Sequence, residues 1–94
     1  MKAYEREFLT ETLETCSVSI AYLLREGFTS EEVLESQREL TDLGLMWVRG
    51  FVASRLMLLR SCCARNPNIS PADLDEVTEL VDEHEAKIAG QLYS

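Results

Sequence analysis

Residues 43–59, LGLMWVRGFVASRLMLL, form a long apolar stretch in the middle of the chain. Twelve of these 17 residues are apolar and two more are glycine, so that only Arg49, Ser54 and Arg55 are polar. A helix on the surface of a globular protein usually has an apolar arc of about 100°. Placed on a helix, this stretch is apolar around most of its circumference. The pattern therefore predicts a helix that is covered on several sides.

Two companion helices of the same chain can each cover one flank of this helix, which leaves apolar surface exposed along a long rod. A transmembrane span is disfavoured, because the run is shorter than about 20 residues and contains two arginines. Burial against a second chain accounts for the surface, and a twofold homodimer is the commonest arrangement. We therefore predict a dimer or partner interface with Trp47 and Phe51 as its anchors. The predicted interface residues are Leu40, Met46, Trp47, Gly50, Phe51 and Leu58.

A helix-start signal precedes the apolar stretch. Thr29 can cap a helix, and Glu32 three residues later can reach back to its backbone amide. No proline follows until Pro67. The sequence therefore predicts one helix over residues 30–65, roughly 50 Å long.

The same start signal recurs further along the chain. Ser70 can cap a helix and Asp73 can complete the capping box, which predicts a helix over residues 71–90. Before the middle helix, apolar residues recur at helical spacing over residues 3–26, and Gly27 supplies a residue that commonly ends a helix.

These elements define the predicted fold class. It is all-α, a three-helix antiparallel arrangement with a long central helix, packing into a homodimeric helical bundle. With 94 residues, the chain is predicted to form a single helical domain over residues 1–94.

The charge of the chain is strongly acidic but unevenly distributed. The formal net charge is −8, with four basic and ten acidic residues in 1–42, four arginines and no acidic residue in 43–72, and one lysine and seven acidic residues in 73–94. Direct nucleic-acid binding requires a dense basic face, which this composition does not provide. Without a basic amphipathic face, binding to a membrane surface is not expected either. The acidic outer helices favour a protein partner with a basic face.

The cysteines indicate a reducing environment. Cys16, Cys62 and Cys63 are odd in number, and the adjacent pair is poorly placed for an ordinary disulfide. The first residues also lack the apolar core of a secretion signal. A cytoplasmic location is therefore expected.

His84 is the only histidine, and it lies in line with apolar residues of the helix predicted over 71–90. It lacks the second histidine of a zinc-protease helix, and no Glu-x-x-His pair offers ligands to a di-iron centre. We interpret His84 as a core or interface residue, and as a possible pH-sensitive position of the interface. No metal ion or other cofactor is predicted.

Four arginines, at positions 49, 55, 60 and 65, lie in the stretch without acidic residues. They could bind an anion, but their directions around a helix differ. We expect them instead to pair with Glu76, Glu79 and Glu83 when the last helix folds back.

The predicted function is that of a small cytoplasmic protein–protein interaction module. Small anti-activators and inhibitors are similar in size and composition, and they bind and mask a surface of another protein such as a transcription factor. One alternative is a secretion-type chaperone or adaptor. No catalytic constellation is found, so an enzyme is not expected.

The enzyme alternative is a small dimeric all-α protein of the chorismate-mutase style. All-α chorismate mutases are similar in size, and their sites use several basic residues with a glutamine or glutamate on facing helices. Gln37, Arg38, Arg49 and Arg55 offer the same residue types here. In those enzymes the first helix is the longest, whereas the middle helix is predicted to be the longest in this chain.

Overall fold

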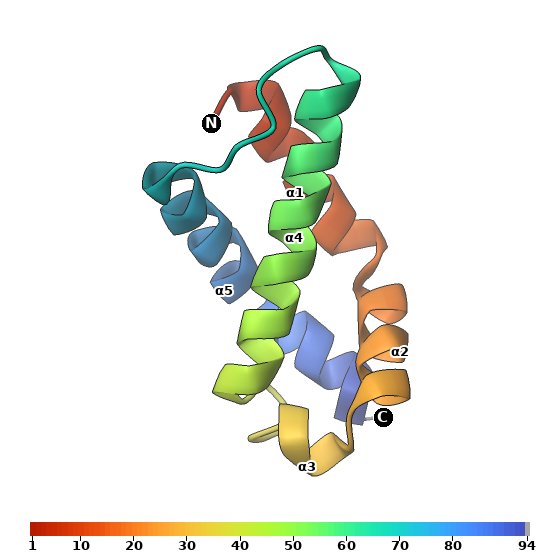
Figure 1. Ribbon diagram of the computed structural model, residues 1–94. Coiled ribbons are helices and arrows are strands. Elements are labelled where there is room, and N and C mark those ends of the chain that lie inside the picture. Colours follow the sequence, from red (N-terminus) through yellow and green to blue (C-terminus); the bar gives the residue numbers. More distant parts are fainter. Residues whose placement is uncertain (94) are drawn as a thin grey trace.

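A computed structural model describes residues 1–93 of the protein. These residues form five helices and no strand. The helices are α1 (Ala3–Thr15), α2 (Ser17–Gly27), α3 (Ser30–Val33), α4 (Asp42–Cys62) and α5 (Pro71–Tyr93). The predicted all-helical class is confirmed, but two of the three predicted helices are interrupted (Figure 1).

The helix predicted over residues 3–26 is broken at Cys16, where α1 ends and α2 begins in a new direction (Figure 1). Three threonine hydroxyls of α1 donate to backbone carbonyls one turn earlier, those of Thr10, Thr12 and Thr15. Such bonds compete for the carbonyls of the helix and tend to bend it. The break lets α2 lie along α5, while α1 packs against both α4 and α5.

The helix predicted over residues 30–65 is wrong in its first third. It consists of the single turn α3, a connection over residues 34–41, and α4. Leu34 and Leu40 form an isolated antiparallel bridge within the connection. The backbone amide of Leu40 donates to Glu85 Oε2 at 2.8 Å, and that of Thr41 donates to the Val33 carbonyl at 2.8 Å. These tertiary bonds, together with burial of Val33 and Leu40, outweigh the local preference for helix.

Thr41 starts α4, because its hydroxyl accepts a hydrogen bond from the Gly44 amide at 3.1 Å. With 21 residues, α4 is about 32 Å long, whereas the helix predicted over residues 30–65 would be roughly 50 Å long. The longest helix is α5, with 23 residues. It begins at Pro71 as the sequence indicates, with reciprocal bonds between Ser70 and Asp73, and it continues past Gly90 to Tyr93.

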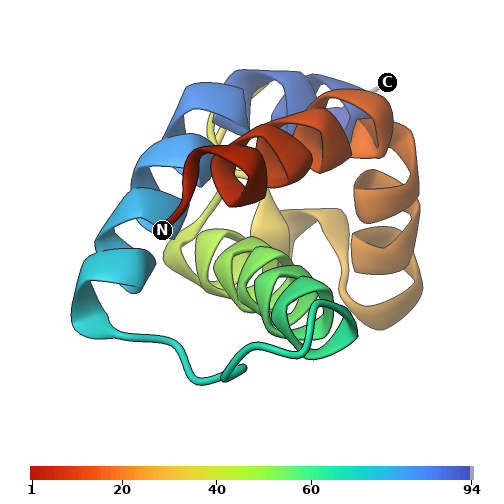
Figure 2. The same cartoon turned by 90° about the horizontal axis from the view of Figure 1, so that it is seen from above.

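The core lies between α4 and the helices behind it. Seen from above, α1 and α5 lie across one side of α4, and none of the described helices covers its opposite side (Figure 2). One line of α4 faces the core at a spacing of four residues. That line comprises Gly44, Val48, Val52, Leu56 and Arg60. The rest of the helix circumference is partly or fully exposed.

Two glycines allow the packing of α3 on α4 to be tested. A Cβ added at Gly44 would lie 2.9 Å from the Val33 carbonyl oxygen, whereas one added at Gly90 would meet nothing within 4 Å. We therefore expect Gly44→Ala to lower the free energy of unfolding by about 1–3 kcal/mol. Gly90→Ala should raise it by about 0.5–1 kcal/mol, because glycine disfavours a helix interior. Urea unfolding followed by circular dichroism measures both; effects of the same sign would contradict the close approach of α3 to α4.

Candidate interaction surface

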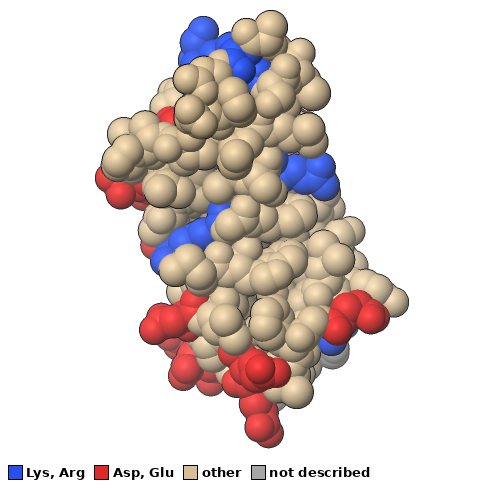
Figure 3. All heavy atoms as spheres, in the orientation of Figure 1, with Lys and Arg blue, Asp and Glu red and all other residues tan. Residues whose placement is uncertain are grey.

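The outward side of α4 is apolar. We call it the α4 face, and it comprises Leu43, Met46, Trp47, Gly50, Ser54, Met57 and Leu58. Met46 is 64% exposed and Leu58 53% exposed, although both are large apolar side chains. The side of the molecule that α4 presents is largely uncharged, with basic residues at separate points, most of the acidic residues at the end near α3, and a few on the α5 side (Figure 3).

The structure places the predicted interface residues at different depths. Met46, Gly50 and Leu58 are exposed on the α4 face. Trp47 and Phe51 are half-buried and stacked on each other, with ring centroids 5.6 Å apart, and both pack against the core. These two aromatic residues therefore already have partners within the chain.

Leu40 requires a correction. It is only 4% exposed and belongs to the core of its own chain, because the connection before α4 folds it inward. It has too little accessible surface to anchor an interface. Leu43 and Met57 were not among the predicted interface residues, but they are 45% and 42% exposed and lie on the α4 face.

A groove borders the α4 face on the side of α5. Met46, Gly50 and Ala53 form one wall, and Leu74 with Val77 forms much of the other. Leu74 is a further large apolar side chain that is 48% exposed. The groove therefore extends the apolar surface from α4 onto α5.

Basic side chains lie on both edges of the α4 face. Arg49 lies 3.6 Å from Asp82 of α5, and the Arg55 guanidinium lies 5.2 Å from the centroid of the Phe51 ring. The predicted pairing of arginines with α5 thus occurs at Arg49 with Asp82 and at Arg60 with Asp73, and not with Glu76, Glu79 or Glu83. The enzyme alternative also named Gln37 and Arg38. These two residues lie in the exposed connection before α4, whereas Arg49 and Arg55 lie on α4 itself.

His84 lies away from the α4 face. Its Nδ1 donates to the Leu80 carbonyl at 2.8 Å, and its Nε2 is 4.0 Å from Glu14 of α1. The side chain therefore sits where α1 and α5 meet within the chain, so a pH-sensitive role at the α4 face is not supported. Cys16 is half-buried, and Cys62 and Cys63 are exposed; all three are free thiols.

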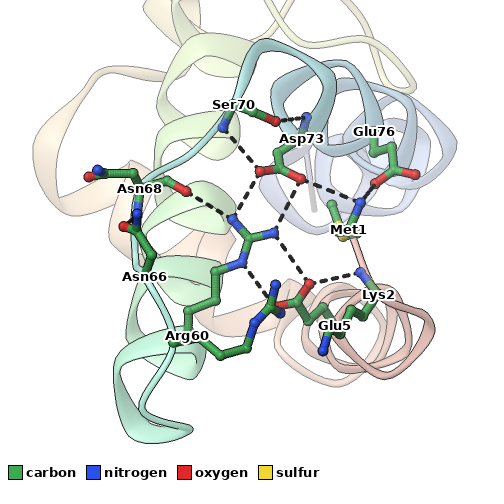
Figure 4. Close-up of polar contacts among 10 residues, drawn as sticks. Met1, Lys2, Glu5, Arg60, Asn66, Asn68, Ser70, Asp73 and Glu76 are labelled. Atoms are coloured by element: carbon green, nitrogen blue, oxygen red, sulfur yellow. Dashed lines mark hydrogen bonds and ion pairs between the residues drawn. The ribbon is translucent and has the colours of Figure 1, made fainter.

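Behind the α4 face, a buried ion-pair network holds the C-terminal end of α4 (Figure 4). Arg60 is 4% exposed and Glu5 is fully buried. Arg60 Nε donates to Glu5 Oε2 at 2.9 Å, and Arg60 Nη1 donates to Asp73 Oδ2 at 2.9 Å. The same Nη1 also donates to the carbonyl of Asn68 at 3.0 Å, and Arg65 Nη1 donates to Glu5 Oε2, the oxygen that Arg60 Nε also binds.

The network strongly favours the charged forms of its members. The hydrogen bond from Arg60 is the main reason that the pKa of Glu5 is lowered to about 2, despite the opposing effect of burial. The same guanidinium lowers the pKa of Asp73, and the two carboxylates raise the pKa of Arg60. Arg60 thereby joins α1, α4 and the start of α5, which positions the helices that support the α4 face.

The sequence predicted that Arg60 pairs with Glu76, Glu79 or Glu83, and this network was not predicted. A signal was present, because Arg60 continues the four-residue spacing of Val48, Val52 and Leu56 on the core-facing line of α4. Arginine at such a position requires acidic partners, since a buried charge is costly unless it is paired. Their identity could not be read locally, because Glu5 is 55 residues away in the chain.

Comparison of the chain with protein-family models, with curated proteins and with solved structures gave no match. Within residues 1–93, no group of three or more His, Cys, Asp or Glu side chains is arranged to hold a metal ion. No helix in this range has both the length and the apolar character needed to cross a membrane.

Proposed function

We propose that this protein is a protein–protein interaction module that associates with a second copy of itself through the α4 face. The observation that carries the proposal is the exposure of several large apolar side chains on one side of one helix. Single exposed apolar residues are common on monomers, whereas a contiguous patch marks an interaction site. The basic and acidic residues around the patch are typical of the polar rim of an interface.

The core supports a binding role for this surface. Trp47 and Phe51 are stacked and packed against the core, so the flank of the patch that carries Trp47 is ordered. The Arg60 network fixes the end of the same helix from behind. A surface whose side chains are already ordered loses less conformational entropy when it binds.

Self-association leaves the acidic outer surfaces free for a target. Glu7, Glu11 and Glu14 are exposed on α1, and Glu83 is exposed on α5. An acidic surface of this kind attracts a partner with a basic face and discriminates against acidic ones. On this basis we propose a regulator of the anti-activator or inhibitor type, which masks a basic surface of another protein.

The proposal is tested by the solution mass of the protein over a hundredfold range of concentration. We expect the wild type to associate, and Met46→Glu to raise the dissociation constant at least tenfold, which is about 1.4 kcal/mol. The reason is that a charge at a 64% exposed position costs little in the monomer and much in the buried interface.

Tyr22→Glu is the matched control, because Tyr22 is 61% exposed but lies on α2, away from the α4 face. It should associate like the wild type. A wild type that stays at the mass of one chain throughout, or equal weakening by both substitutions, would overturn the proposal. Circular dichroism of each variant checks that the helices are retained.

A further inference from the structure

The two ends of the α4 face differ in charge. Around the N-terminal end of α4, exposed acidic residues predominate, namely Glu31, Glu35, Glu39 and Asp42. From residue 43 to residue 72 the chain has only arginines as charged residues. Arg55 is exposed near the middle of α4, and Arg65, just beyond its C-terminal end, is partly exposed and also bound to Glu5. In Figure 3 most acidic residues of this side lie at the end near α3, with a few more on the α5 side, and basic residues lie at the middle and at the opposite end.

This polarity distinguishes two ways of pairing the face with a second copy. A parallel pair would place the acidic end of one copy beside the acidic end of the other. An antiparallel pair separates the two acidic ends and places each beside the C-terminal end of α4 of the other copy, where the charged residues of that helix are arginines. It also opposes the two helix dipoles favourably. The charges therefore favour the antiparallel pair.

The shape of the face suits a crossing near the middle of α4. Gly50 and Ser54 lie on either side of the helix midpoint at Val52, and a Cβ added at Gly50 would meet nothing within 4 Å. Larger side chains occupy both halves of the face, including Met46 in one and Met57 in the other. In an antiparallel pair, the small residues meet at the crossing and each large cluster packs against the other.

We infer that the α4 face is occupied by a second copy of this chain in antiparallel orientation, related by a twofold axis that passes near Gly50 and Ser54. The inference rests on the proposed function and adds the geometry of the pair. It places Met46 of each copy beside Met57 of the other, because these two residues lie on the same flank at similar distances from the midpoint. The two copies of residue 46 are then far apart from each other, as are the two copies of residue 57.

Disulfide trapping tests this geometry. In a background in which Cys16, Cys62 and Cys63 are replaced by serine, Met46→Cys and Met57→Cys are prepared as separate proteins, mixed, and oxidised mildly. Only sulfurs whose Cβ atoms approach within about 4.5 Å form a bond readily. We expect the mixed disulfide between positions 46 and 57 to exceed either same-position disulfide at least tenfold by mass spectrometry.

The outcomes separate the inference from the proposal beneath it. An excess of same-position disulfides would indicate a parallel pair, and would overturn the inference while the association through the α4 face stands. A statistical mixture of all three disulfides would also overturn the inference, because no single arrangement then exists. No disulfide, together with the mass of a single chain in light scattering, would overturn both.

Discussion

Replacing Arg60 with methionine is expected to lower the free energy of unfolding by about 3–5 kcal/mol. The substitution keeps most of the side-chain volume but leaves Glu5 and Asp73 without the guanidinium that each of them binds. Glu5 is fully buried, so water cannot replace the lost partner without opening the structure. Arg65 retains its contact with Glu5 and reduces the loss only in part.

Urea unfolding at neutral pH measures this effect, and Arg55→Met provides the control. Arg55 lies on the same helix, but its exposed guanidinium contacts only the Phe51 ring among the interactions identified, so a change below about 1 kcal/mol is expected. Similar losses for the two variants would show that the network does not stabilise the fold.

A compensating variant separates the loss of the ion pairs from simple repacking. Combining Arg60→Met with Glu5→Gln and Asp73→Asn removes the uncompensated charges, so much of the lost stability should return. This recovery is expected because a buried charge without a partner costs more than the absence of the whole pair. Asparagine at position 73 also keeps an oxygen that can accept the hydrogen bond from the Ser70 amide.

The helical class follows from the sequence, but the lengths of the helices do not. The start of α5 was predictable, because Ser70 and Asp73 form a local capping pair. The end of α3 depends instead on contacts with distant residues, such as the bond from the Leu40 amide to Glu85. Helical periodicity continues across residues 34–41, so no local signal shows that the chain turns back there.

The candidate surface was predictable in part, because helical phase alone places Met46, Gly50 and Leu58 on one side. The direction of the core was not predictable from a helix that is apolar around most of its circumference. Only the packing of α1 and α5 decides it, and Trp47 and Phe51 are then half-buried by their own chain. Leu40 is buried rather than exposed because α4, the helix in which it was predicted to lie, begins only at Asp42.

The stability of the wild type is expected to fall as the pH drops from about 5 to about 2. Carboxyl groups of the unfolded chain take up protons near pH 4, whereas the pKa of Glu5 in the folded protein is about 2. Between these values the unfolded state binds more protons, so acid favours unfolding. The contribution from Glu5 alone is on the order of 2–3 kcal/mol, and Asp73, whose pKa is also lowered, adds to it.

The Arg60→Met variant connects this acid dependence to the network. Because the hydrogen bond from Arg60 is the main cause of the lowered pKa of both carboxyl groups, its removal should make the free energy of unfolding less dependent on pH. The two proteins should therefore differ most in stability near neutral pH and converge as the pH approaches 2. Urea unfolding at a series of pH values measures both curves. Parallel curves would place the acid sensitivity in carboxyl groups elsewhere on this acidic chain.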